Sequence, residues 1–193
     1  MLLTRGHLTR FARDRRAASA VEFALSLPFL LVLYIGGIQL SQAVSADRKV
    51  TLLARTVGDL VAQSASLSST DVQNILSIST AVLYPLPLTD GGGTSKVTMK
   101  VSEVWTNSKN ITKVDWSKGQ NATADTSGQT VTIPDPEGDT ATVMAVVSYT
   151  YTPTVSFGII GPLTMTKTIY MRPRLSECVA LDGAICGSAA YGS

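Results

Sequence analysis

Histidine is almost absent from this chain. Its 193 residues include only one, His7, within the first 16 residues. The remainder of the chain therefore cannot assemble a Ser-His-Asp or Cys-His arrangement. Cysteine is also scarce, and its two cysteines do not supply the His and Cys spacing of a zinc site. We expect that the chain is not an enzyme, that it binds no metal ion or cofactor, and that it has no small-molecule substrate.

Excess positive charge is missing outside the N-terminus. The formal net charge is +2, but residues 1–16 contain five arginines and one aspartate and so carry +4. The rest of the chain therefore carries −2. It lacks the basic excess on which nucleic-acid binding relies, so no nucleic acid is expected as a partner.

Charged residues are also absent between Glu22 and Asp47. This uncharged run of 24 residues exceeds the roughly 20 that a helix needs to cross the hydrocarbon core. It also exceeds the apolar region of an ordinary secretory signal, which has about 7–15 residues. Because arginine-rich flanks stay in the cytoplasm, the basic segment 1–17 should be cytoplasmic and residues from Asp47 onward exported. We therefore predict one membrane-spanning helix over 18–46, surrounded by lipid.

Beyond the membrane, apolar residues continue at spacings of three and four, which indicates one long helix over about 19–64. The residues of this stripe are Val50, Leu53, Val57 and Leu60. A second helix is predicted from the capping-box spacing of Thr70 and Gln73, and it should end before Pro85. Exported helices are thus expected over 47–83.

From Lys96 onward the hydrophobic period changes to two, which is typical of half-buried strands. The pair Val104-Trp105 interrupts the alternation and predicts a β-bulge. Short connections favour antiparallel pairing. We predict an α+β fold with a β-rich domain over 84–193. Its further strands are expected over 111–116, 129–133, 140–152 and 164–171, with a polar loop over 118–128.

The start of the uncharged run resembles the processing site of type IV pilin-like proteins. In that family a peptidase cuts just before the hydrophobic helix, and a glutamate is the fifth residue of the mature chain. If Glu22 is that glutamate, the resemblance implies cleavage between Ala17 and Ala18. Alanine stands at position 17, where the family usually has glycine. The sequence from Ser19 to Leu25, Ser-Ala-Val-Glu-Phe-Ala-Leu, is most similar to the TadE-like family of tight-adherence pilus proteins.

This resemblance implies a pilin-like fold and a role as a pseudopilin, or minor pilin, in the bacterial inner membrane. A prepilin peptidase would remove the leader. The new amine of Ala18 would be able to pair with Glu22, either within the chain or on a neighbouring subunit. Glu22 with Phe23 would contact other pilins, pseudopilins or the inner-membrane assembly platform. The segments 114–117, 147–151 and 170–174 also resemble the exported half of the family.

Two alternatives remain open at this stage. Glu22 can instead be an interfacial residue solvated by lipid headgroups. The chain can also be an uncleaved, single-pass membrane anchor that carries a binding module on the outer side of the membrane. The pseudopilin and the anchored binding module differ in whether residues 1–17 are removed and in whether Glu22 is needed for association with other subunits.

The two cysteines, Cys178 and Cys186, lie on the predicted outer side, where an oxidising compartment favours a disulfide. Closing so short a loop stabilises by about 2–3 kcal/mol in the chain-entropy model. Two free thiols or half of a metal site are the alternatives. The metal site is disfavoured because His7 is predicted to lie on the other side of the membrane.

Overall fold

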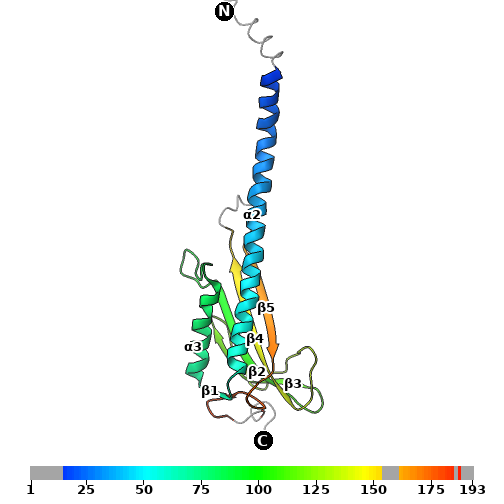
Figure 1. The fold of residues 1–193 in the computed structure, drawn as a ribbon. Coiled ribbons are helices and arrows are strands. Elements are labelled where there is room, and N and C mark those ends of the chain that lie inside the picture. The colour runs from blue at the N-terminus through cyan, green and yellow to red at the C-terminus, as the bar shows by residue number, and fades with distance from the viewer. Residues whose placement is uncertain (1–14, 154–160, 185–186, 188–193) are drawn as a thin grey trace, which may run out of the picture. The chain divides into compact units, whose positions relative to one another are not determined.

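A computed structural model of the chain describes residues 15–153, 161–184 and 187. The described residues fall into two compact units, one that ends at Ala43 and one that begins at Val44. Helix α2 spans Arg15–Ala62 without a break, so it supplies all of the described part of the first unit and the start of the second (Figure 1).

Within the described residues, α2 is the one helix long and apolar enough to cross a membrane, judged by length and composition. Its most apolar stretch of 18 residues has a mean hydropathy of 2.0, and no residue of that stretch is buried. The helix continues through Pro28, although proline lacks the N–H that an interior turn uses. The long helix predicted from the sequence is therefore confirmed.

From Val44 onward, α2 covers one face of a sheet (Figure 1). The helix approaches the sheet closely at Gly58, where a Cβ atom would lie 3.3 Å from Sδ of Met171 and 3.6 Å from Cβ of Ala145. The predicted stripe is correct except at its last position: Leu60 is 39% exposed and Val61 is buried instead. A helical period of 3.6 residues explains this, since the face of Val57 returns at Val61. The buried residues of this part of α2 are Ala46, Val50, Leu53, Ala54, Val57, Val61 and Ala62.

The sheet has four strands in the order β3-β2-β4-β5, and every neighbouring pair is antiparallel. The strands are β2 (Val97–Thr106), β3 (Thr112–Gln120), β4 (Thr140–Tyr151) and β5 (Leu163–Met171). Alternate residues of β2 and β4 are buried, as a period of two requires. The predicted α+β class, with an antiparallel sheet, is confirmed.

Two details predicted near β3 were wrong. The polar loop expected over 118–128 begins later, because β3 continues to Gln120. The segment 129–133 is not a strand: Thr130 makes a single isolated bridge to β3. The side chain of Ile133 is nevertheless buried against Val104 and Val114. The apolar character of this segment therefore reflects packing on the sheet rather than a place in it.

A second helix, α3 (Ser69–Ser79), is followed by the 3-10 turn η1 (Thr80–Leu83). Its capping box lies two residues before the predicted one. The N–H of Asp71 donates to Oγ of Ser68 at 3.1 Å, and the N–H of Ser68 donates to Oδ2 of Asp71 at 3.0 Å. The predicted cap, Thr70, is already inside the helix, because the chain leaves its extended conformation at Ser68.

A short parallel pair, absent from the sequence-based prediction, joins the segment after α2 to the C-terminal segment. Strand β1 (Ser66–Leu67) follows α2 and pairs with β6 (Ala180–Leu181) near the C-terminus. The N–H of Ser69 also donates to Oδ1 of Asp182 at 2.8 Å. The C-terminal segment is thus attached to the start of α3.

Candidate functional site

The predicted cleavage and pairing residues all lie on the first part of α2. Ala18 and Glu22 are four residues apart on one helix, a spacing that places two positions on the same face, one turn apart. Glu22 is exposed and the side chain of Phe23 is 60% exposed. Only the backbone of Ala17 and Ala18 is described, and it is helical. A carboxylate and a chain terminus created at Ala18 would therefore lie on the same side of the helix.

Glu22 stands at the edge of a large exposed apolar surface. Its neighbours Val21 and Phe23 are 59% and 60% exposed, and Leu25 is 74% exposed. Large apolar side chains remain exposed as far as Val44. Such a surface requires lipid or other helices around it. A carboxylate beside it is costly unless it finds a partner.

The predicted disulfide joins Cys178 to Cys186, and Cys186 lies outside the described residues. Cys178 is buried, with 2% of its surface exposed. The disulfide therefore stays a prediction. The structure does describe the residue after each cysteine, Val179 and Gly187. The backbone N–H of each donates a hydrogen bond to an acidic side chain of the sheet.

The first of these carboxylates belongs to Glu103, which is 1% exposed in β2. Its Oε1 accepts a hydrogen bond from the N–H of Val179 at 2.6 Å, and its Oε2 accepts one from Nε1 of Trp116 at 2.8 Å. Burial raises the pKa of the Glu103 carboxyl to about 8. The negative charge of Asp115 acts in the same direction, and the two hydrogen bonds act against it.

The second carboxylate belongs to Asp115, which is 6% exposed in β3. The N–H of Gly187 donates to its Oδ2 at 3.0 Å, whereas Oδ1 has no partner among the described residues. Asp115 is the extra residue of a β-bulge, because Glu103 pairs with Trp116 and Val104 with Val114. The predicted bulge is thus present on this strand pair, with its additional residue on β3 rather than on β2.

Sequence reasoning missed this pair of carboxylates, although one signal for it exists. Glu103 continues the inward-facing series of Val97, Met99 and Val101, and a carboxylate on an apolar strand face is unusual. The two carboxyl groups accept hydrogen bonds from backbone N–H groups of the C-terminal segment, so their arrangement serves to anchor that segment. No nucleophile or reactive group accompanies them in these contacts.

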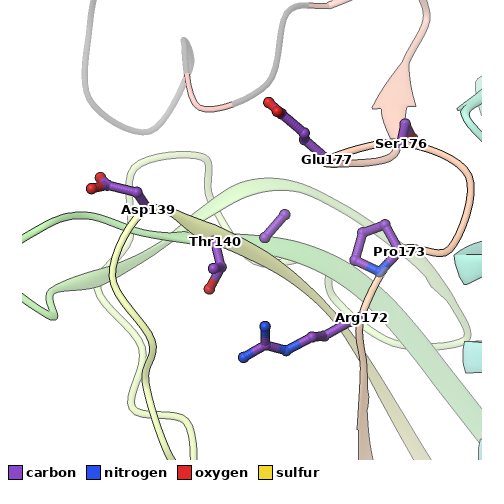
Figure 2. Close-up of a pocket in the computed structure, with 7 residues that line it drawn as sticks. Asp139, Thr140, Arg172, Pro173, Ser176 and Glu177 are labelled. Carbon is purple, nitrogen blue, oxygen red and sulfur yellow. The ribbon is translucent and has the colours of Figure 1, made fainter.

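A shallow pocket of about 280 Å³ opens where β4 begins and β5 ends. Figure 2 shows Asp139 and Thr140 on one side, with Arg172, Pro173, Ser176 and Glu177 on segments that follow β5. Arg172 forms an ion pair with Glu137, and the hydroxyl of Ser176 donates to the carbonyl of Cys178. The described residues contain no group of three or more His, Cys, Asp or Glu side chains that could hold a metal ion.

Comparison with known proteins gives one match. Residues 17–59 match the family described as TadE-like protein. The matched region begins at Ala17, includes Glu22, and ends within the part of α2 that covers the sheet. The resemblance predicted from the sequence is therefore confirmed for this region. No match was found among curated proteins or among solved structures.

Proposed function

Because its N-terminal helix matches TadE-like proteins, we propose that the chain is a pilin-like subunit of a tight-adherence pilus system, in the role of a pseudopilin or minor pilin. The observation that carries this proposal is the position of Glu22. Between Ala17 and Ala46 it is the only charged residue, and the large apolar side chains around it are exposed as far as Val44. Such a helix suits insertion in the inner membrane followed by packing against the helices of other subunits.

The proposed sequence of events begins with the leader. A prepilin peptidase hydrolyses the peptide bond between Ala17 and Ala18, so residues 1–17 are released and Ala18 acquires an amine. In an environment of low dielectric constant an unpaired ammonium or carboxylate costs several kcal/mol, and pairing recovers much of that cost. The amine of a neighbouring subunit can therefore pair with Glu22 and fix the axial position of one helix against the next.

Phe23 contributes to the same contact in a different way. It is next to Glu22 and 60% exposed, so it can pack against a neighbouring apolar helix while the carboxylate pairs. The second unit then remains outside the membrane as an α+β domain. This arrangement gives the chain a structural role, in agreement with the TadE-like family, and assigns it no catalysis.

The mature N-terminus tests this proposal. The full-length chain is expressed in its native membranes, and its intact mass and N-terminal sequence are determined. We expect a mature chain that starts at Ala18, with or without a methyl group on the amine. A chain that keeps residues 1–17, or one that starts near Asp47, would contradict the proposal. An uncleaved chain would favour the anchored binding module instead.

A further inference from the structure

The outward face of α2 in the second unit carries two exposed arginines. Arg48 and Arg55 are exposed, and neither forms an ion pair or side-chain hydrogen bond with any described residue. Leu52 lies between them and is 54% exposed, and Val44 is 45% exposed. These four residues recur at spacings of three and four, so they share one face of the helix. We call this face the arginine stripe.

The acidic residues of the same helix segment are already engaged. Oδ1 of Asp47 lies 2.8 Å from Nζ of Lys167 on β5. Oδ1 of Asp59 lies 2.5 Å from Nη2 of Arg174, and its Oδ2 accepts a hydrogen bond from Gln63 at 2.5 Å. Both carboxylates are therefore turned to the sheet side or to their own helix. Among the described residues, no carboxylate forms an ion pair with the arginines of the stripe, which also carries two exposed apolar side chains.

We infer that the arginine stripe docks a helix from a different subunit, one that presents carboxylates opposite Arg48 and Arg55 and an apolar side chain opposite Leu52. The inference rests on the proposed function, because it names the partner that the helix would meet during assembly. An amphipathic helix with acidic residues matches both the charge and the apolar centre of the stripe.

A second copy of this chain fits the stripe poorly. Parallel packing in register would place Arg48 against Arg48 and Arg55 against Arg55, and like charges in contact disfavour association. A staggered arrangement would place Asp47 or Asp59 of the second copy opposite an arginine, and each would first have to leave its ion pair with Lys167 or Arg174. The charge pattern of the stripe therefore favours a different chain over a second copy.

Lipid headgroups fit only the first part of the stripe. Arg55 is nine residues beyond Ala46, the last residue of the uncharged run. At 1.5 Å per residue this places Arg55 about 13 Å farther along the helix. The headgroup layer on each side of a bilayer is only about 5–8 Å thick. Arg48 can reach phosphate groups there, whereas Arg55 lies beyond them, so a lipid surface cannot engage both arginines.

Photo-cross-linking in native membranes tests the inference. The full-length chain carries p-benzoylphenylalanine in place of Leu52, and adducts are identified by mass spectrometry. We expect the main adduct to join position 52 to an acidic helix of another pilus subunit. Arg48→Glu or Arg55→Glu should lower its yield roughly tenfold. Reversal of the charge on the acidic residue of the partner should restore the yield.

Two controls are matched to these variants. Lys109→Glu reverses one exposed charge in the turn between β2 and β3, and we expect it to leave the adduct unchanged. A second probe replaces Ile111, which is 42% exposed in the same turn, and should not give that adduct. A main adduct with a second copy, adducts with lipid alone, or a yield that ignores Arg48→Glu and Arg55→Glu would each overturn the inference.

The same sample distinguishes failure of the inference from failure of the proposed function. The N-terminus of the cross-linked chain is sequenced along with the adduct. A chain cleaved before Ala18 that cross-links to itself contradicts only the inference. A chain that retains residues 1–17 and forms no adduct with any pilus subunit contradicts both.

Discussion

The indole Nε1 of Trp116 lies 2.8 Å from Oε2 of Glu103 and 2.7 Å from the carbonyl oxygen of Val179. One N–H thus faces two acceptors from segments far apart in the sequence. The N–H of Val179 in turn donates to Oε1 of Glu103 at 2.6 Å. Strands β2 and β3 and the C-terminal segment are therefore joined through a single buried carboxyl group.

The first prediction concerns the pH dependence of stability. The pKa of Glu103 is raised from 4.5 to about 8 in the folded chain, so the folded state keeps a proton that the unfolded state loses. The stability contributed by this proton is fully present below pH 4.5 and is lost as pH rises through about 8. We expect the free energy of unfolding to fall by on the order of a few kcal/mol across this window.

Tryptophan fluorescence of the full-length chain in detergent measures this effect. Both tryptophans of the chain lie beside the C-terminal segment: Trp116 through its hydrogen bonds, and Trp105 within 3.3 Å of a Cβ atom placed on Gly187. In Glu103→Gln no proton is exchanged at this position. The fall in the free energy of unfolding between pH 4.5 and 8 should then disappear. At pH 5 the variant should also be less stable than wild type by about 1–3 kcal/mol, because its amide leaves one N–H without an acceptor. An unchanged slope in the variant would assign the effect to another group.

A second prediction uses two glycines with different surroundings. A Cβ atom on Gly119 of β3 would lie 2.2 Å from the carbonyl oxygen of Ala122, so the backbone must move. A Cβ atom on Gly91 would meet nothing within 4 Å. We expect Gly119→Ala to lower the free energy of unfolding by about 1–3 kcal/mol, and Gly91→Ala to change it little. Thermal unfolding monitored by circular dichroism compares the two, and equal stability of the variants would refute the proposed clash.

Local patterns in the sequence predicted much of this fold. The uncharged run before Asp47 requires a long helix, and α2 spans Arg15–Ala62. The alternation over 140–152 predicts a strand, and β4 spans Thr140–Tyr151. Both patterns are set by neighbouring residues. Periodicity is therefore sufficient to recognise these elements, and to predict their ends within a few residues.

Contacts between distant segments could not be predicted in this way. The pairing of β1 with β6 joins residues more than 100 positions apart. Burial of Glu103 depends on Val179, which only the folded chain brings to it. The two carboxylates of Asp47 and Asp59 look free in the sequence, but the sheet side supplies Lys167 and Arg174 as their partners. Tertiary contacts, rather than local preference, decide each of these features.

The third prediction is a disulfide between Cys178 and Cys186. We expect both thiols to resist alkylation in unreduced protein from intact cells, because an oxidising compartment maintains such bonds. Cys178→Ser should lower stability by about 2–3 kcal/mol without changing membrane insertion, since the bond closes a short loop at the C-terminal end. Mass spectrometry after alkylation with and without reductant provides the measurement. Complete labelling before reduction would contradict the prediction.

The last prediction concerns Glu22. Glu22→Gln removes the charge that would pair with the amine of Ala18 and keeps nearly the same shape. Membrane insertion and the α+β domain should be unaffected, because the rest of the run is apolar and Glu22 lies outside the second unit. Removal of the leader is a separate recognition step, so we expect it to change less than association does. Cross-linking to other pilus subunits should fall, and surface fibres with it.

Asp47→Asn is the matched control for this substitution, since it also converts a carboxylate of α2 to an amide. It removes the ion pair between Asp47 and Lys167, in which the two side chains are 42% and 32% exposed, respectively. Such an exposed pair contributes about 0–1 kcal/mol, so processing and cross-linking should stay close to wild type. The mass of each mature chain and the yield of cross-linked subunits are compared side by side. Because a lost charge at position 22 leaves an amine unpaired in low dielectric, the two variants must differ if Glu22 pairs. If Glu22→Gln cross-links as well as Asp47→Asn, Glu22 is an interfacial residue, and the anchored binding module becomes the better description of the chain.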